Sequence, residues 1–208
     1  MTAVIRVGLL HVPGLDFATG EEVRRVLAAE LGAVVFLHES YAAGQRNWIE
    51  ELLTRWCDEE ELDLVLTVGG TLPAPGPSSR EIVPEATAAV LDRALPGLAE
   101  AMRQAGQEDE PLAWIDRGIA GIRSRTLIVN LPAGAAAALF LSGIVDLLPP
   151  VLAHLRDDPD APVLGARRAV DLDVDAPAPP GPPAPAKGLD ADEFAAFLRR
   201  RRGESDDE

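Results

Sequence analysis

Two rhythms of apolar and polar residues run along this chain, and together they predict strands that alternate with helices. Short apolar runs of strand length lie at residues 5–11, 33–38, 63–68 and 126–131. Residues 111–115 form a fifth candidate strand. The run at 63–68, DLVLTV, is almost continuously apolar, which is typical of a strand buried on both faces of a parallel sheet.

Helical spacing of apolar residues fills most of the segments between these strands. The predicted helices cover residues 20–31, 48–56, 84–95, 97–103 and 135–154. In the first of them, Val23, Leu27 and Leu31 fall on one face. The third begins with Pro84 at the first helical position, where a missing amide hydrogen costs little. This order of elements predicts a doubly wound α/β fold.

The composition changes near Asp157 and predicts three parts: a folded domain at 1–157, an Asp/Pro-rich linker at 158–188, and a short helix with an acidic end at 189–208. The linker contains APAPPGPPAPA, whose six prolines predict an extended spacer of about 30 Å. In the last part, Phe194, Phe197 and Leu198 share a helical face ahead of four arginines.

Such a helix of about 13 residues is marginal in water by itself, so its apolar face needs a groove. We expect a tethered docking helix, with either the chain's own assembly or a separate protein as its partner. A tail without contacts is the alternative.

Charge and composition narrow the function classes. The net charge of −15 argues against nucleic acid as a partner, because phosphates require clustered cations. The only lysine is Lys187, so an anion pocket in the domain must use arginines, backbone amides or a metal. The apolar stretches fall short of the ~20 residues that span a bilayer, so we expect no membrane partner. Residues 1–12 are interpreted as a strand and not a signal peptide.

Cysteine and histidine usage adds little chemistry. Cys57 is the single cysteine, which excludes an internal disulfide and fits a reducing cytoplasm. It is either a small buried apolar residue or a reactive thiol. The three histidines are dispersed without metal-ligand spacing, and structural roles are expected for His11, His38 and His154.

The stretch LTVGGTLPAPGPSSREIVPEAT at 66–87 is the main candidate for chemistry. A strand that runs into Gly69-Gly70-Thr71 is how many phosphate-binding turns begin, although a plain tight turn looks the same. Ser79 and Arg80 are either solvated loop residues or anion contacts. Glu81 either favours a helix N-terminus or binds a metal.

Several stretches in order resemble the molybdopterin adenylyltransferase family, which includes the gephyrin G-domain. They are DLVLTVGGT followed by REIVPEAT, the helix from 96 to 103, RGIAGIRSRTLIVNLPAG at 117–134 and LLPPVLAH at 147–154. The resemblance covers residues 4–156. It implies a three-layer α/β fold with a mostly parallel sheet and helices on both faces, a homotrimer, and binding of molybdopterin, with ATP and Mg²⁺ as further ligands of active members.

The resemblance also implies site residues. Glu81 stands where the family has a catalytic, Mg²⁺-binding aspartate. Contacts with phosphate, nucleotide or pterin are implied for Gly69, Gly70, Thr71, Ser79, Arg80, Asn130, Leu131 and Pro132.

The chain departs from the family pattern at the ligand end. Leu72 stands where the family has glycine, and Pro73, Pro75 and Pro77 cannot donate hydrogen bonds. The family's second acidic position falls near Gly44, where this chain has no carboxylate. We therefore expect weakened catalysis on a retained scaffold.

Two functions follow. The first is a molybdopterin-binding protein of molybdenum cofactor biosynthesis, with weak ATP- and Mg²⁺-dependent adenylylation. The alternative is a non-catalytic trimeric scaffold of the same fold that presents its C-terminal docking helix. The loop prolines favour the scaffold, whereas Gly69-Gly70-Thr71 and Asn130-Leu131-Pro132 favour the first function.

Overall fold

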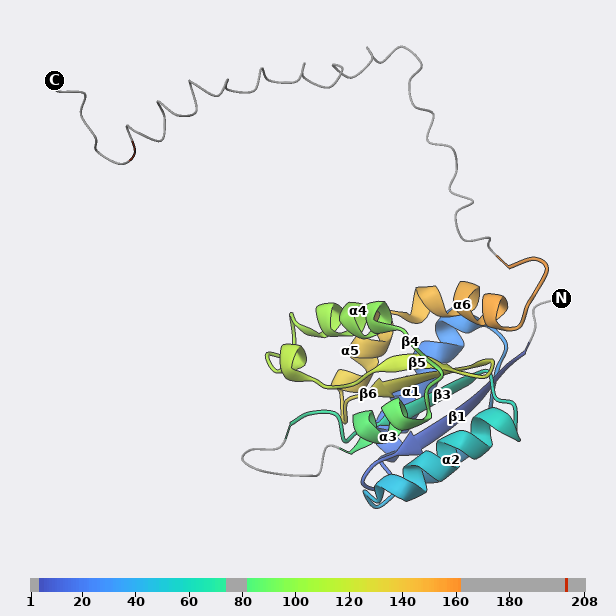
Figure 1. Ribbon diagram of the computed structural model, residues 1–208, viewed down its shortest axis with the longest axis horizontal. Coiled ribbons are helices and arrows are strands. Elements are labelled where there is room, and N and C mark those ends of the chain that lie inside the picture. The colour runs from blue at the N-terminus through green and yellow to red at the C-terminus, as the bar shows by residue number, and fades with distance from the viewer. Residues whose placement is uncertain (1–3, 74–81, 162–200, 202–208) are drawn as a thin grey trace, which may run out of the picture. The chain divides into compact units, whose positions relative to one another are not determined.

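The computed structural model describes residues 4–73, 82–161 and 201. Its centre is a six-stranded sheet with the order β2-β1-β3-β6-β5-β4 (Figure 1). The strands are β1 (Ile5–His11), β2 (Val34–Tyr41), β3 (Leu64–Val68), β4 (Arg93–Ala94), β5 (Ala120–Arg123) and β6 (Thr126–Leu131). β2, β1, β3 and β6 are parallel neighbours, and β5 pairs antiparallel with both β6 and β4. The sheet is therefore mostly parallel, as the sequence predicted.

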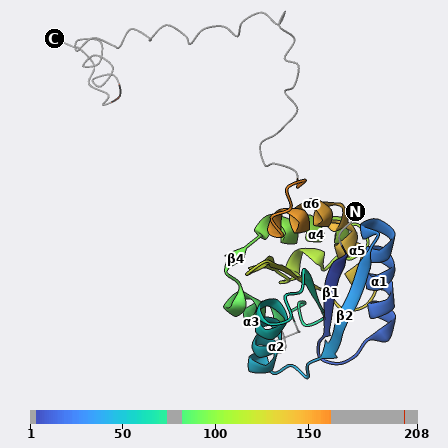
Figure 2. The ribbon, with the colours of Figure 1, turned by 90° about the vertical axis from the view of Figure 1, so that its right-hand side faces the viewer.

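Helices cover both faces of this sheet (Figure 2). They are α1 (Phe17–Leu31), α2 (Arg46–Asp58), α3 (Val83–Val90), α4 (Pro96–Gly106), α5 (Ala136–Ser142) and α6 (Leu148–Leu155), with short 3₁₀ turns η1 (Ala113–Ile115) and η2 (Val145–Leu147). The face with α1, α4, α5 and α6 holds the larger apolar core, and α2 and α3 cover the other face. The three-layer α/β fold is thereby confirmed.

Alternating side chains of the central strands feed the two cores, because neighbours along a strand point to opposite faces. Leu9 of β1 packs with Leu27 of α1 in the larger core, whereas Leu10 packs with Leu53 and Trp56 of α2 in the smaller one. Each fully buried side chain of this size contributes about 1.5–3 kcal/mol. Burial on both faces explains why the central strands read as nearly continuous apolar runs.

Three predicted elements were wrong in detail. The helix expected at 84–95 ends with α3 at Val90, and Arg93–Ala94 form the short strand β4. The strand expected at 111–115 is the 3₁₀ turn η1, and the strand of this region is β5, further along the chain. The helix expected at 135–154 is divided into α5, η2 and α6. Pro149 and Pro150 lie in the first turn of α6, and they lack the amide hydrogens that would continue a helix through this point.

The chain divides into two units, Met1–Val163 and Leu164–Glu208. The predicted linker at 158–188 and terminal helix at 189–208 lie almost entirely outside the described residues. No single helix of the described part is long and apolar enough to cross a membrane; only the bent pair Ala136–Ser142 with Val145–Leu155 reaches that length and apolarity together.

Candidate functional site

The carboxyl ends of β1, β3 and β6 meet at one edge of the sheet, because the three strands are parallel neighbours. From β1 the chain crosses through α1 to β2 on one side, and from β2 it crosses through α2 to β3 on the other side of β1. The point between β1 and β3 is thus a topological switch point, where doubly wound folds form a crevice for ligands. We call the edge of the sheet where the carboxyl ends of β1, β3 and β6 meet the carboxyl edge, and the opposite one the amino edge.

Gly69 and Gly70 follow β3 directly at this edge, and both adopt left-handed backbone conformations, with φ of 92° and 69°. A Cβ atom on Gly69 would lie 2.1 Å from the carbonyl oxygen of Val12, and one on Gly70 would lie 2.7 Å from Val83 Cγ2. No other residue fits at either position. The Gly69 amide donates to the Leu131 carbonyl at 2.9 Å and joins the turn to the end of β6.

The next three amides of the turn belong to Gly70, Thr71 and Leu72. None of them has a hydrogen-bond partner within residues 4–73 and 82–161. Consecutive unpaired N–H groups at the end of a strand are a means of binding an anion without cationic side chains. The prolines predicted to spoil this turn begin only at Pro73, after these three donors.

The Thr71 side chain faces inward. It is fully buried, and its hydroxyl donates to Oδ2 of Asp116, at the end of η1. Burial raises the pKa of Asp116, although hydrogen bonds from Thr71 and the Gly118 amide oppose that shift. Thr71 therefore has only its backbone amide to offer as a donor to a ligand.

Asn130, Leu131 and Pro132 lie at the end of β6, and all three are buried. The Asn130 amide group donates to the hydroxyls of Thr67 and Thr87, at 3.0 and 2.9 Å. These bonds join β6 to β3 and α3 from within. Asn130 thus stabilises the carboxyl edge through contacts inside the domain. Contacts of Asn130, Leu131 and Pro132 with a pterin stay predictions.

A second polar network holds the loop after β1. His11 is fully buried; its Nδ1 accepts from the Asp16 amide at 3.4 Å, which leaves Nε2 to donate to Glu39 at 3.0 Å. Arg24 of α1 pairs with the other Glu39 oxygen at 2.6 Å. His11 therefore has a structural role, as the sequence predicted, and it fixes the chain beside Val12, which contacts Gly69.

Two charged residues near the turn, Arg117 and Glu85, belong to neighbouring segments of the chain. The Arg117 amide donates to the Thr71 carbonyl at 3.1 Å, and the Arg117 guanidinium pairs with Glu85 of α3. The side chains of Asp116 and Arg117 bind separate partners 45 and 32 residues earlier, a long-range arrangement that local sequence does not signal.

The remaining predicted site residues, Ser79, Arg80 and Glu81, lie outside the described residues. Within the described part of the chain, no group of three or more His, Cys, Asp or Glu side chains could hold a metal ion. One buried carboxylate oxygen there, Glu85 Oε2, has no hydrogen-bond partner in that part.

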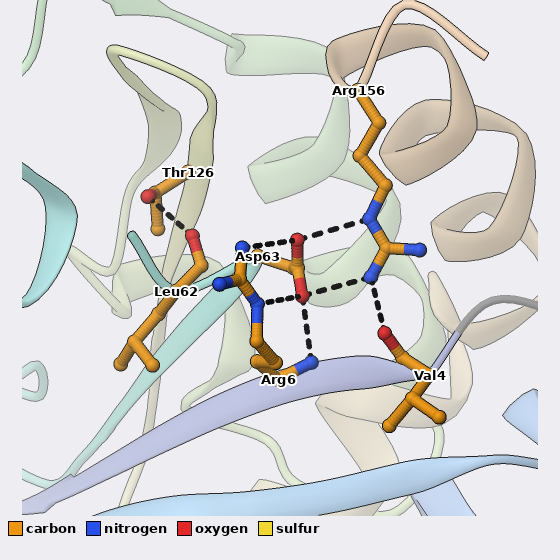
Figure 3. Close-up of polar contacts among 6 residues, drawn as sticks. All are labelled: Val4, Arg6, Leu62, Asp63, Thr126 and Arg156. Carbon is orange, nitrogen blue, oxygen red and sulfur yellow. Dashed lines mark hydrogen bonds and ion pairs between the residues drawn. The ribbon is translucent and has the colours of Figure 1, made fainter. Parts of the chain in front are cut away.

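The opposite, amino edge of the sheet carries a hollow of about 590 Å³ lined by Arg6, Asp63 and Arg156, among others. Figure 3 shows both arginines turned toward the Asp63 carboxylate. Arg156 Nε donates to Asp63 Oδ1 at 2.9 Å, and the Arg6 amide donates to Oδ2 at 2.7 Å. Burial alone would raise the pKa of Asp63, but the hydrogen bonds from Arg156 and Arg6 outweigh it and lower the pKa.

These bonds join β1, the start of β3 and the end of α6, so Asp63 belongs to the scaffold. Cys57 lines the same hollow and is itself buried, and burial raises the pKa of its thiol to about 12. The thiol is therefore protonated at neutral pH, and the reactive alternative does not apply.

Known proteins match this chain in sequence and in structure. Residues 25–154 match the family of probable molybdopterin binding domains. The molybdopterin adenylyltransferase of Helicobacter pylori J99 is 41% identical over 114 residues, which are 55% of this chain and 62% of that protein. The molybdopterin adenylyltransferase of Haemophilus influenzae is 36% identical over 138 residues, 64% of this chain and 68% of that protein. This chain thus spans less than two thirds of the length of the Helicobacter relative.

Solved structures agree with the fold. The molybdopterin biosynthesis enzyme MoaB of Thermus thermophilus superposes with a TM-score of 0.66 at 38% identity, over 75% of this chain and 99% of that one. The molybdopterin biosynthesis Mog protein of Mycobacterium ulcerans gives 0.62 at 28% identity, over 74% and 99%. The family match covers more than half of the chain and includes β3, β6 and the glycine turn. The resemblance seen in the sequence is therefore confirmed, and this chain belongs to the family of probable molybdopterin binding domains.

Proposed function

We propose that this protein binds molybdopterin at the carboxyl edge and acts in molybdenum cofactor biosynthesis. The observation that carries the proposal is the turn at Gly69–Leu72: two left-handed glycines at the switch point, followed by three amides without a partner in the described chain. A phosphate monoester such as that of molybdopterin is the kind of ligand these donors suit. The names of the relatives, molybdopterin adenylyltransferase and molybdopterin biosynthesis enzyme, support the same ligand.

The chemistry available to such a complex is transfer of an adenylyl group. A phosphate oxygen of molybdopterin attacks the α-phosphorus of ATP, and pyrophosphate leaves. Following the resemblance, Glu81 would hold Mg²⁺, which would supply positive charge for the phosphate oxygens, and Ser79 and Arg80 would contact the nucleotide.

Turnover in this proposal is slow compared with a relative that has both acidic residues. The segment around Gly44 offers no carboxylate between Glu39 and Glu50, and the longer Glu81 side chain moves its carboxylate outward by one methylene.

The proposed assembly is a homotrimer in a reducing cytoplasm. The trimer rests on the resemblance, and three exposed apolar side chains on and beside η1, Leu112, Trp114 and Ile115, are compatible with burial against another copy. The buried, unpaired Cys57 is compatible with a reducing compartment.

The non-catalytic scaffold is the less favoured function. The relatives that this chain matches are named molybdopterin adenylyltransferases, which favours the first function.

Titration with molybdopterin, followed by calorimetry or by the absorbance of the pterin, tests the proposal. We expect saturable binding with a Kd of about 1–10 μM, near −8 kcal/mol. ATP with Mg²⁺ is then added, and slow formation of adenylylated molybdopterin is expected. No saturation up to about 1 mM ligand would reject the function, whereas binding without adenylylation would leave a carrier of molybdopterin.

A further inference from the structure

Asp116 is a buried carboxylate for which the proposed function has given no role. It lies directly after η1 and is 5% exposed. Its two oxygens have separate donors: the Thr71 hydroxyl on Oδ2 and the Gly118 amide on Oδ1, the latter at 2.8 Å. The ion pair of Arg117 is with Glu85, so among the described residues the Asp116 carboxylate is held by these two hydrogen bonds.

The backbone around Asp116 is held from three directions. The Arg117 amide donates to the Thr71 carbonyl, so Thr71 is bound to this loop through both its side chain and its backbone. Arg103 of α4 donates to the carbonyl oxygens of Asp116 and Gly118, at 3.4 and 3.1 Å. Gly118 allows this close approach, since a Cβ there would lie 2.7 Å from Asp116 Oδ1. Contacts with α4 and within its own loop therefore hold the Asp116 carboxylate independently of Thr71.

Within residues 4–73 and 82–161, the hydrogen bonds of the turn beyond Gly69 are those of Thr71 with Asp116 and Arg117. Gly69 is joined to β6 through the Leu131 carbonyl, but the amides of Gly70, Thr71 and Leu72 bind nothing in the described chain. A segment with two left-handed glycines has many backbone conformations open to it. Fixing Thr71, the residue after both glycines, selects the direction in which these amides point.

We propose that Asp116 is the positioning residue of the anion-binding turn: its carboxylate anchors the Thr71 hydroxyl and so orients the amides of Gly70, Thr71 and Leu72 toward the molybdopterin phosphate. This inference rests on the proposed function and names Asp116 as the residue that orients the hydrogen-bond donors of the proposed site. Preorganised donors bind an anion more tightly than mobile ones, because less conformational entropy is lost on binding.

Substitutions at Asp116 and Thr71 distinguish the effect of the hydrogen bond between these residues from the effect of the negative charge of Asp116. Asp116→Asn keeps both contacts, with Oδ1 accepting from Gly118 and Nδ2 donating to the Thr71 oxygen, but it removes the charge. Asp116→Leu is of similar size and makes neither bond. Thr71→Val removes the hydroxyl alone. Thr126→Val is the matched control, because Thr126 is a buried threonine at the amino edge whose hydroxyl donates to the Leu62 carbonyl.

Two quantities are measured in each variant: the Kd for molybdopterin, and the exchange rate of the Arg117 amide hydrogen by NMR. That amide donates to the Thr71 carbonyl and therefore reports how firmly the turn is held, with or without a ligand. We expect about tenfold faster Arg117 exchange and about tenfold weaker binding in Asp116→Leu and in Thr71→Val. The double variant should resemble either single one. Asp116→Asn should stay within about threefold of the wild type, and Thr126→Val should change neither quantity.

Wild-type Arg117 exchange in Asp116→Leu and Thr71→Val would overturn the proposal, as would Asp116→Asn behaving like Asp116→Leu. Should Asp116→Leu not fold, Thr71→Val provides the same comparison. If the wild type does not bind molybdopterin, the proposed function fails. The exchange rates still decide whether Asp116 holds the turn.

Discussion

Single residues determine whether the carboxyl edge can bind an anion. The conformation of some of these residues could be predicted from the sequence, whereas the contacts of others could not. Gly69-Gly70-Thr71 was recognisable because a strand that ends in two glycines limits the backbone locally. The inward direction of Thr71 was not, since its partner Asp116 lies 45 residues later. The pairing of Asp63 with Arg6 and Arg156 was hidden for the same reason, with separations of 57 and 93 residues.

Gly70→Ala should weaken molybdopterin binding at least tenfold and lower the free energy of unfolding by about 1–2 kcal/mol. A Cβ at this position meets Val83 in addition to the strain of a positive φ. Gly32→Ala is the control: Gly32 has a similar φ of 71°, nothing lies within 4 Å of its Cβ position, and it follows α1 at the amino edge. Its unfolding free energy should fall by about 1 kcal/mol, with an unchanged Kd. Equal losses of binding in both variants would show that the effect is general instability.

Asp63→Asn should destabilise the protein by about 2–4 kcal/mol at pH 7, because it leaves two arginines without their shared carboxylate; the part-exposed Arg6 side chain keeps the loss at the lower end of this range. The folded-state pKa of Asp63 is lowered. Its stabilising effect is therefore complete above the unfolded pKa of about 3.9 and is lost as the pH falls through the lower folded value. Urea unfolding of both proteins from pH 7 down to pH 3 should show the difference shrinking below about pH 4. A difference that stays constant over this range would contradict the role given to Asp63.

Helices and strands were largely predictable where the pattern of apolar residues alone determined the element. The buried strands β3 and β6 and the amphipathic helices α1 and α2 followed from periodicity alone. Pro111–Ile115 misled because an apolar run of five residues fits a strand or a 3₁₀ turn equally well, and only packing decides. The short strands β4 and β5 gave too little pattern, and the prolines at 149–150 that divide the last helix were interpreted as part of it.

The packing of α4 against α5 depends on glycines that sequence patterns do not explain. Gly106 at the end of α4 lies against Phe140 of α5, and a Cβ there would be 2.2 Å from Cε2 of that ring. Gly106→Ala should therefore cost about 2–3 kcal/mol of unfolding free energy by displacing Phe140. Gly97→Ala, in the first turn of the same helix with nothing within 4 Å of its Cβ, should instead stabilise by up to about 1 kcal/mol. Urea denaturation measures both, and similar effects from the two alanines would rule out the packing explanation.

The whole domain separates its two edges by role. At the amino edge the ion pairs of Asp63 join β1, β3 and α6, whereas the carboxyl edge presents amides without partners in the described chain. This division follows from the parallel strand order, which brings every strand-to-helix turn of the central sheet to the carboxyl edge. The parallel arrangement was predictable from alternating strands and helices. The proposed ligand came from the resemblance, because no periodicity encodes it.

A homotrimer is expected in solution. Light scattering coupled to size exclusion should give a mass of about 66 kDa, three times the 22.1 kDa of one chain, at micromolar concentrations. Trp114→Glu places a charge among exposed apolar side chains and should shift the mass toward one chain if this patch is buried between copies. A wild-type mass of 22.1 kDa would contradict the assembly.

Where molybdopterin binds is tested most directly by an NMR titration of the ¹⁵N-labelled protein. Amide resonances of Gly70, Thr71 and Leu72 should shift saturably as molybdopterin is added, because a phosphate that accepts from these amides changes their electronic environment. Resonances of Arg6, Leu127 and Gly32 at the amino edge should stay in place. Shifts confined to the amino edge, with the turn unaffected, would contradict the assignment of the ligand site to the carboxyl edge.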